Sequence, residues 1–140
     1  MRRRAALAML AALAASSIAP ASLAQDPRAL QAQEAAREWL DLADRQDADA
    51  ARSAAGAKFR DALAADRWRD ALRSVRGPLG EVTQRTAVST QLTRTLSGQP
   101  DGDYALVAFR TSWSRKPVGR ELVSLEYESG RWRVIGYVIQ

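Results

Sequence analysis

Three carboxylates in this sequence are candidates for acid–base chemistry: Asp41, Asp44 and Glu121. The sequence contains no histidine and no cysteine. A proton transfer near neutral pH would therefore fall to an aspartate, a glutamate or a tyrosine whose pKa is strongly shifted. A carboxylate base inside a pocket is the form of catalysis that these residue types leave open.

The positions of the three carboxylates distinguish them. Asp44 lies nearer than Asp41 to the edge of the apolar stripe of a predicted helix, so it has the better chance of pointing inward. Glu121 begins a predicted strand. Structural roles are open as well: a solvated helix face for the two aspartates, and a cross-strand ion pair with Arg85 or Arg110 for Glu121.

A second set of side chains is typical of a binding pocket. Four aromatic residues could line such a pocket and two arginines could fix an anionic or polar ligand. These residues are Trp39, Tyr104, Trp113, Tyr137, Arg85 and Arg110. Ordinary core packing is the alternative for the aromatic residues. Arg131 and Arg133 flank Trp132 and project to one side of a strand, toward an acidic partner or toward solvent.

The sequence predicts neither a metal site nor a cofactor. Histidine and cysteine, the favoured ligands of zinc, are absent. Asp101-Gly102-Asp103 is too short for a calcium loop and is typical of a turn. The sequence also lacks a glycine-rich phosphate loop and a Gly-x-Ser-x-Gly elbow.

The first 24 residues have the pattern of an export signal. Arg2, Arg3 and Arg4 precede an uncharged stretch, residues 5–24, and small residues precede a predicted cut between Ala24 and Gln25. We expect a periplasmic or secreted protein without a membrane span after this cut, with an uncleaved anchor as the alternative. The net charge of +5 over 140 residues falls to +2 without the three arginines. Such a spread charge argues against a nucleic-acid partner.

Residues 25–140 have the size of a single domain, in which the hydrophobic period changes once. A period near 3.6 predicts three helices, at residues 27–45, 49–58 and 64–75. Asp26-Pro27 is a favourable start for the first of them. A period of two predicts four strands, at residues 82–96, 104–114, 121–128 and 131–139. Helices followed by antiparallel strands predict an α+β fold, with N-terminal helices packed on one face of the sheet.

Both faces of the predicted second strand are partly apolar, because Leu106 and Ala108 alternate with Val107 and Phe109. Helices on one face would leave apolar side chains of the other face in water. We therefore expect a partner to cover that face, and a homodimer formed through the sheet is the hypothesis.

Several blocks of residues carry a resemblance to a known family. They are residues 76–82 with Arg85, residues 101–104 with 109–113, and Glu121 with residues 130–137. From about Ala35 to Ile139 the chain resembles the exported bacterial family called domain of unknown function 4019. That family looks related to the nuclear transport factor 2-like superfamily, which implies a cone of helices on a curved sheet, often around a pocket. The family has no assigned chemistry, so the resemblance implies no catalytic residue.

Taken together, these features predict a small exported domain, residues 25–140, that is a non-catalytic ligand-binding or protein-interaction module of the cell envelope. The alternative is a small pocket enzyme, of the isomerase or dehydratase kind, with Asp41, Asp44 or Glu121 as its base. A structural subunit of an envelope complex is a third hypothesis. The expected partners are a small-molecule ligand or a second copy of the chain.

Overall fold

The computed structural model describes residues 26–140. The predicted signal segment, residues 1–24, and the cut after Ala24 lie outside the described residues. Within the described part, helices precede a four-stranded antiparallel sheet that stays open, so the predicted α+β class is confirmed. The elements are α1 (Pro27–Asp44), α2 (Ala48–Ala54), α3 (Ala57–Ala62), α4 (Ala65–Arg76), a 3₁₀ turn (Gly77–Leu79), β1 (Val82–Thr93), β2 (Tyr104–Trp113), β3 (Lys116–Glu128) and β4 (Arg131–Ile139).

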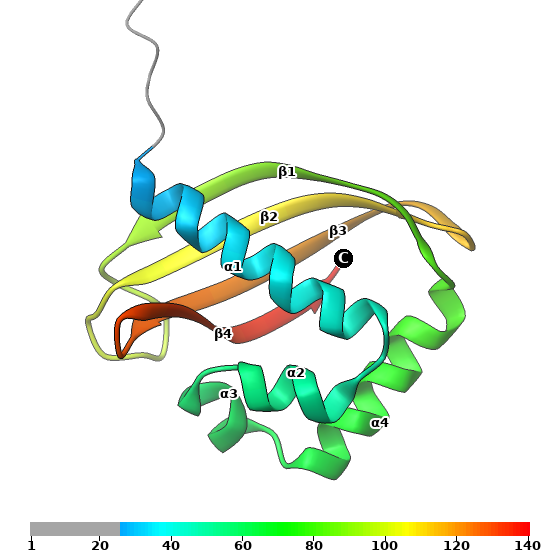
Figure 1. Ribbon diagram of the computed structural model, residues 1–140, viewed down its shortest axis with the longest axis horizontal. Helices are drawn as coiled ribbons and strands as arrows, with labels where there is room; N and C mark the ends of the chain where they lie inside the picture. Colours follow the sequence, from blue (N-terminus) through cyan, green and yellow to red (C-terminus); the bar gives the residue numbers. More distant parts are fainter. Residues whose placement is uncertain (1–25) are drawn as a thin grey trace, which may run out of the picture.

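The helix α1 covers one face of the sheet (Figure 1). Asp26 caps it, because its carboxylate accepts a hydrogen bond of 2.8 Å from the backbone N–H of Arg28, and Pro27 occupies the first turn. The stripe predicted from the 3.6-residue period is the buried face: Ala29, Ala32, Ala36, Trp39, Leu40 and Ala43. The small alanine side chains let the helix lie close to the strands below it.

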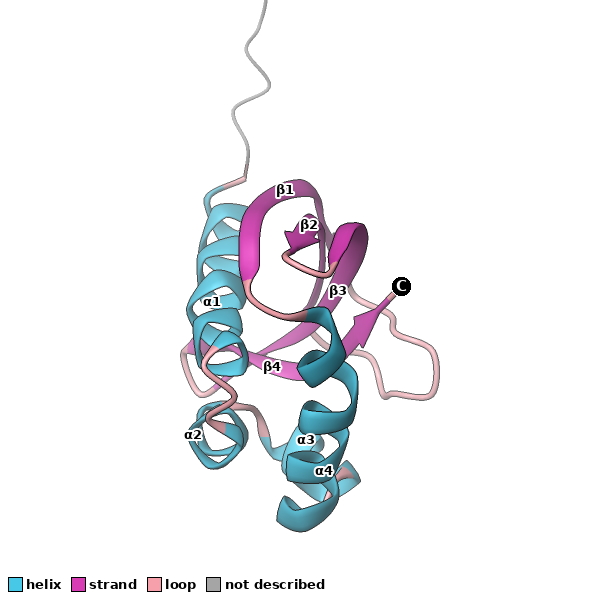
Figure 2. Cartoon of the chain, turned by 90° about the vertical axis from the view of Figure 1, so that its right-hand side faces the viewer, coloured by secondary structure: helices cyan, strands magenta, loops and turns pink. Residues whose placement is uncertain are grey.

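The sheet has the strand order β1-β2-β3-β4, so each strand pairs with its neighbour in sequence. Figure 2 shows its curvature from the side, with α1 along one face. The turn predicted at Ser129-Gly130 joins β3 to β4, and both residues have positive φ, 52° and 86°. This conformation is that of a two-residue hairpin turn, which fixes the register of the last two strands.

The helices α2, α3 and α4 gather at one end of the molecule, below the sheet in Figure 1. Two tryptophans connect these helices with α1 and with one another. The indole Nε1 of Trp39 donates to the carbonyl of Ala51 at 2.8 Å, and that of Trp68 donates to the carbonyl of Ala48 at 2.9 Å. The rings of Trp39, Trp68 and Phe59 pack together with centroids 5.0–5.8 Å apart. This aromatic cluster closes that end of the core.

Two element boundaries differ from the prediction. The helix expected at 49–58 is two helices, because the chain breaks at Gly56, whose N–H donates to the carbonyl of Val134 at 2.8 Å. The third strand begins at Lys116 and not at Glu121. Its added segment includes Pro117, which is tolerated because β4 ends at Ile139, opposite Glu121, so that residues 116–119 pair with β2 alone.

Candidate functional site

A cluster of charged side chains lies between the end of α1 and the sheet, with Arg85 of β1 at its centre. Two guanidinium nitrogens of Arg85 donate to the two carboxylate oxygens of Asp44, both at 2.8 Å. The third nitrogen, Nε, donates to Oε1 of Glu121 on β3, also at 2.8 Å. One arginine thus connects the end of α1 with two strands, and the bidentate geometry is the strong form of an ion pair.

Glu121 is completely buried, and its carboxylate is surrounded by donors. Besides Arg85, the hydroxyl of Thr111 donates to Oε1 at 2.5 Å, and the hydroxyl of Tyr137 donates to Oε2. Both oxygens of the carboxylate are therefore engaged. A buried carboxylate requires such compensation, since leaving it unpaired would be very unfavourable.

Asp44 has a second arginine partner. The guanidinium of Arg76, at the end of α4, is 3% exposed and donates to Oδ1 of Asp44 at 2.6 Å. It also lies 3.4 Å from the hydroxyl of Tyr137. The cluster, which we call the Arg85 cluster, consists of Asp44, Arg76, Arg85, Thr111, Glu121 and Tyr137. Its two carboxylates balance its two guanidinium groups, so its formal charge is zero.

The environment shifts three pKa values in this cluster. Burial alone would raise the pKa of Asp44, but the hydrogen bonds and charges of Arg85 and Arg76 outweigh it, so this pKa lies below the ordinary 3.8. Burial would lower the pKa of Arg85, but Asp44 and Glu121 raise it above its ordinary value. Burial, together with the charge of Glu121, raises the pKa of Tyr137 above 10.0. Each shift keeps the group in the protonation state that the hydrogen bonds require.

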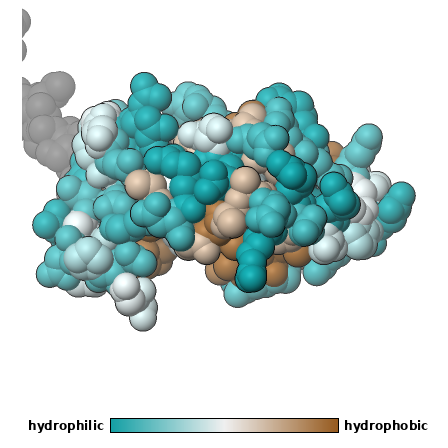
Figure 3. Space-filling view, turned by 90° about the horizontal axis from the view of Figure 1, so that it is seen from below, coloured by the Kyte–Doolittle hydropathy of each residue, from teal (hydrophilic) through white to brown (hydrophobic). Residues whose placement is uncertain are grey.

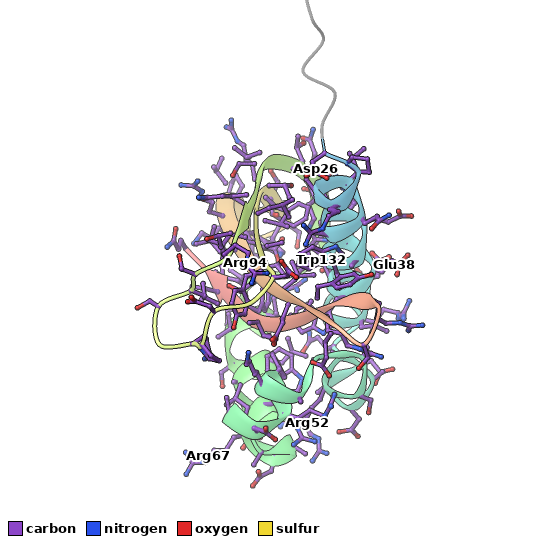
Figure 4. The ribbon with its side chains drawn as sticks, turned by 90° about the vertical axis from the view of Figure 1, so that its left-hand side faces the viewer. Asp26, Glu38, Arg52, Arg67, Arg94 and Trp132 are labelled. Atoms are coloured by element: carbon purple, nitrogen blue, oxygen red, sulfur yellow. The ribbon has the colours of Figure 1, made fainter. Side chains whose placement is uncertain are left out.

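The largest hollow described lies elsewhere, between α1 and β4, and has a volume of about 710 Å³. We call it the α1–β4 groove. Its walls include Glu34, Glu38 and Trp39 of α1, Arg131, Trp132 and Arg133 of β4, and Ala54 at the end of α2. Figure 4 shows Trp132 between β4 and α1, with Glu38 nearby on α1. None of Asp44, Arg85 and Glu121 lines this groove.

The groove has walls of opposite charge. Glu34 and Glu38 lie one helical turn apart on α1, and Arg131 and Arg133 lie at alternate positions of β4. Among residues 26–140, none of these four side chains forms an ion pair. Arg133 donates one long hydrogen bond, 3.5 Å, to the carbonyl of Ala54, and the charges of both walls lack a counter-charge.

The structure places the three candidate carboxylates in different surroundings. Asp41 is exposed on α1 and stays outside the Arg85 cluster. Asp44 points into it, and Glu121 pairs with Arg85, one of the two arginines named as its structural partners. Arg110, the other, is exposed. It lines two shallow hollows with Val88 and Val118.

The aromatic candidates do not form one pocket. The rings of Trp39 and Tyr137 are 5.2 Å apart, and Tyr137 joins the Arg85 cluster. Tyr104 and Trp113 stand at opposite ends of β2, each 1% exposed. The hydroxyl of Tyr104 donates to the carbonyl of Pro100 at 2.6 Å, and Trp113 packs against Gly119.

Several residues of the two sites were missed or underrated by the sequence analysis. Thr111 lies on the same inward face of β2 as Phe109 and Trp113. Because side chains alternate between the two faces of a strand, the sequence could have indicated this position. Arg76 carried no comparable signal, because its role depends on where α4 ends. The i, i+4 spacing of Glu34 and Glu38 predicts a common face but not what that face meets.

The chain belongs to the family described as Protein of unknown function (DUF4019), whose model matches residues 35–137. This match confirms the family resemblance drawn from the sequence. Comparisons with curated proteins and with solved structures give no match. The family description assigns no reaction and no ligand. Function therefore has to be argued from the geometry of the site.

Two further searches concern the described residues alone. No helix between residues 26 and 140 is long and apolar enough to cross a membrane. In the same range no group of three or more aspartate, glutamate, histidine or cysteine side chains is arranged to hold a metal ion.

Replacing Asp44 should make the protein less stable and change its response to acid. Asp44→Asn removes one charge of a largely buried pair, so we expect the free energy of unfolding at pH 7 to fall by about 2–3 kcal/mol. Because the folded pKa of Asp44 is depressed, its contribution is present above pH 3.8 and is lost as the pH falls through the folded value. Urea unfolding between pH 7 and pH 3 should show the two proteins converging.

Asp103→Asn is the matched control. The pKa of Asp103 is also lowered, chiefly by the hydrogen bond from Arg94, but this ion pair lies on the surface. Its effect should be small and should disappear at high salt, which screens exposed charges. An Asp44→Asn protein as stable as the wild type at pH 7, or less stable by the same margin at every pH, would contradict this account.

Proposed function

We propose that this protein is an exported, non-catalytic binding domain whose ligand site is the α1–β4 groove. The observation that carries the proposal is the groove itself, a hollow of about 710 Å³ with aromatic side chains and two walls of opposite, unpaired charge. Sites for small ligands have this size and this mixture of apolar surface with a few polar groups.

The state of the interior carboxylates supports a role without catalysis. A general base must lie within hydrogen-bond reach of the substrate proton that it abstracts. Glu121 is completely buried and accepts hydrogen bonds from three donors, and the two oxygens of Asp44 accept three hydrogen bonds from arginines. The alternative, a pocket enzyme, would have to release one of these carboxylates from its partners.

The sequence supports the export part of the proposal. Arg2, Arg3 and Arg4 followed by the uncharged residues 5–24 have the order of a signal peptide, with a cut after Ala24. On this proposal residues 25–140 are the mature domain, and it acts in the periplasm or outside the cell. The absence of cysteine means that no disulfide is needed for this fold.

Filling the groove should abolish ligand binding. Ala54 is exposed at the end of α2 and lines the groove, whereas Ala62 is exposed at the end of α3 and does not. Native mass spectrometry of protein isolated from the cells that export it should show a retained small molecule on the wild type and on Ala62→Trp. Ala54→Trp should carry none. A wild-type protein without a bound molecule, or an equally loaded Ala54→Trp, would overturn the proposal.

A second candidate function is protein interaction through the face of the sheet opposite α1. Val88 and Val118 are more than half exposed there, at 57% and 59%, and line hollows of about 440 Å³ with Arg110. Monomeric proteins rarely leave a broad apolar area in water. Figure 3 views a different side, the end where α2, α3 and α4 gather, and shows a mostly hydrophilic surface with apolar side chains near its centre.

If this face forms a homodimer, a charge placed on it should separate the two copies. Light scattering after size exclusion should give a dimer for the wild type and a monomer for Val118→Glu, because burying an unpaired carboxylate is unfavourable. Val75→Glu, on another exposed valine, in α4 (48%), should remain dimeric. A wild-type protein that elutes as a monomer at every loading concentration would rule this dimer out.

A further inference from the structure

We propose that the α1–β4 groove binds a short peptide with free amino and carboxyl ends, held in extended conformation along the free edge of β4. This inference rests on the proposed function of the groove and names the class of its ligand.

The first observation concerns the backbone of β4. The carbonyl of Val134 points away from β3, because it accepts the N–H of Gly56 at 2.8 Å. Backbone groups of alternate residues in an antiparallel strand point the same way. The register from Val134 to Trp132 is regular, with Leu125, Glu126 and Tyr127 opposite. The N–H and C=O of Trp132 therefore also face the free edge, inside the groove.

These backbone groups of Trp132 have no partner outside the β3–β4 pair within residues 26–140. An extended peptide can supply one by adding its own backbone to the edge, which is a common mode of peptide recognition. The edge is short. Gly56 already occupies the position at Val134, and the hairpin turn at Gly130 ends the strand on the other side. The space therefore fits a peptide of about three residues, roughly 10 Å long.

The second observation is the charge of the two walls. Glu34 and Glu38 provide carboxylates from α1, and Arg131 and Arg133 provide guanidinium groups from β4. A ligand with an ammonium group at one end and a carboxylate at the other satisfies both walls at once. Guanidinium groups bind a carboxylate with two parallel hydrogen bonds, which adds geometric specificity.

The third observation is the apolar surface between the walls. Trp132 and Trp39 both line the groove, together with Leu42 and Val134. Trp39 and Trp132 are 3% and 7% exposed, so an apolar or aromatic side chain on the central residue of the peptide would contact their exposed edges and pack against the ring of Tyr127, which lines the same groove and is 43% exposed. The three observations are independent, since they concern backbone groups, charges and apolar area respectively.

The probe is the tripeptide Gly-Phe-Gly, titrated into the full chain by calorimetry. The N-acetylated and the C-amidated forms each remove one end charge, and each should bind about tenfold more weakly or worse. A form methylated at the nitrogen of phenylalanine removes the donor for the edge of β4 and should also bind more weakly. In an NMR spectrum of the four tryptophan indoles, the signal of Trp132 should shift, and that of Trp68 should not.

Variants that neutralise one wall of the groove test which end of the peptide that wall binds. In the double variant Glu34→Gln, Glu38→Gln, the free and the N-acetylated peptide should bind with equal affinity. Amidation of the carboxyl end should still weaken binding. Glu81→Gln with Asp61→Asn changes two exposed carboxylates outside the groove and should keep both differences.

The opposite wall is tested in the same way. In the double variant Arg131→Gln, Arg133→Gln, the free and the C-amidated peptide should bind with equal affinity. Acetylation of the amino end should still weaken binding. Arg67→Gln with Arg73→Gln, on exposed positions of α4, is the control and should leave both effects. Figure 4 shows Arg67 at the far end of the molecule from Trp132.

Two results would overturn the peptide proposal. One is that Gly-Phe-Gly causes no heat and no shift of the Trp132 indole at millimolar concentration. The other is that the capped and free peptides bind equally well. If either result came with a small molecule that the wild type retains and Ala54→Trp loses, the ligand class would be wrong and the proposed function of the groove would stand.

Discussion

Arg85 joins the parts of this fold, because its guanidinium contacts Asp44 at the end of α1 and Glu121 on β3 while its backbone belongs to β1. A nearly buried guanidinium is stable only when it is paired with carboxylates, and buried carboxylates are stable only when they accept hydrogen bonds. Arg76, Thr111 and Tyr137 meet that second requirement. The positions of α1, α4 and all four strands are thus fixed by one set of hydrogen bonds.

This constraint also determines where open space remains beside α1. The Arg85 cluster fills the interior at one end of α1, and the rings of Trp39, Trp68 and Phe59 fill the space beside it. The α1–β4 groove lies outside this filled interior, between α1 and β4. The charged side chains there form no ion pair among residues 26–140, in contrast to those of the cluster, although Arg133 donates to the carbonyl of Ala54 at 3.5 Å. A division between a closed polar interior and an open charged groove is what we expect of a binding protein whose interior is structural.

The sequence predicted what depends on local pattern. The buried stripe of α1, the turn at Ser129-Gly130 and the inward position of Asp44 relative to Asp41 all follow from periodicity and turn chemistry, while a catalytic role for either aspartate stays a prediction. The break at Gly56 was missed, because its cause is a hydrogen bond to a strand far along the chain. The groove was missed for the same reason, since its walls come from α1 and β4, which lie near opposite ends of the described chain.

The measurement that tests the structural role of the Arg85 cluster most directly is a double-mutant cycle between Asp44 and Arg85. Asp44→Asn, Arg85→Gln and the double variant are unfolded with urea at pH 7. Our account predicts that each single change destabilises the protein, and that the two changes couple by at least about 1 kcal/mol. Residues kept for catalysis often reduce stability, so replacing them stabilises the fold. Single variants as stable as the wild type, or more stable, would contradict the account.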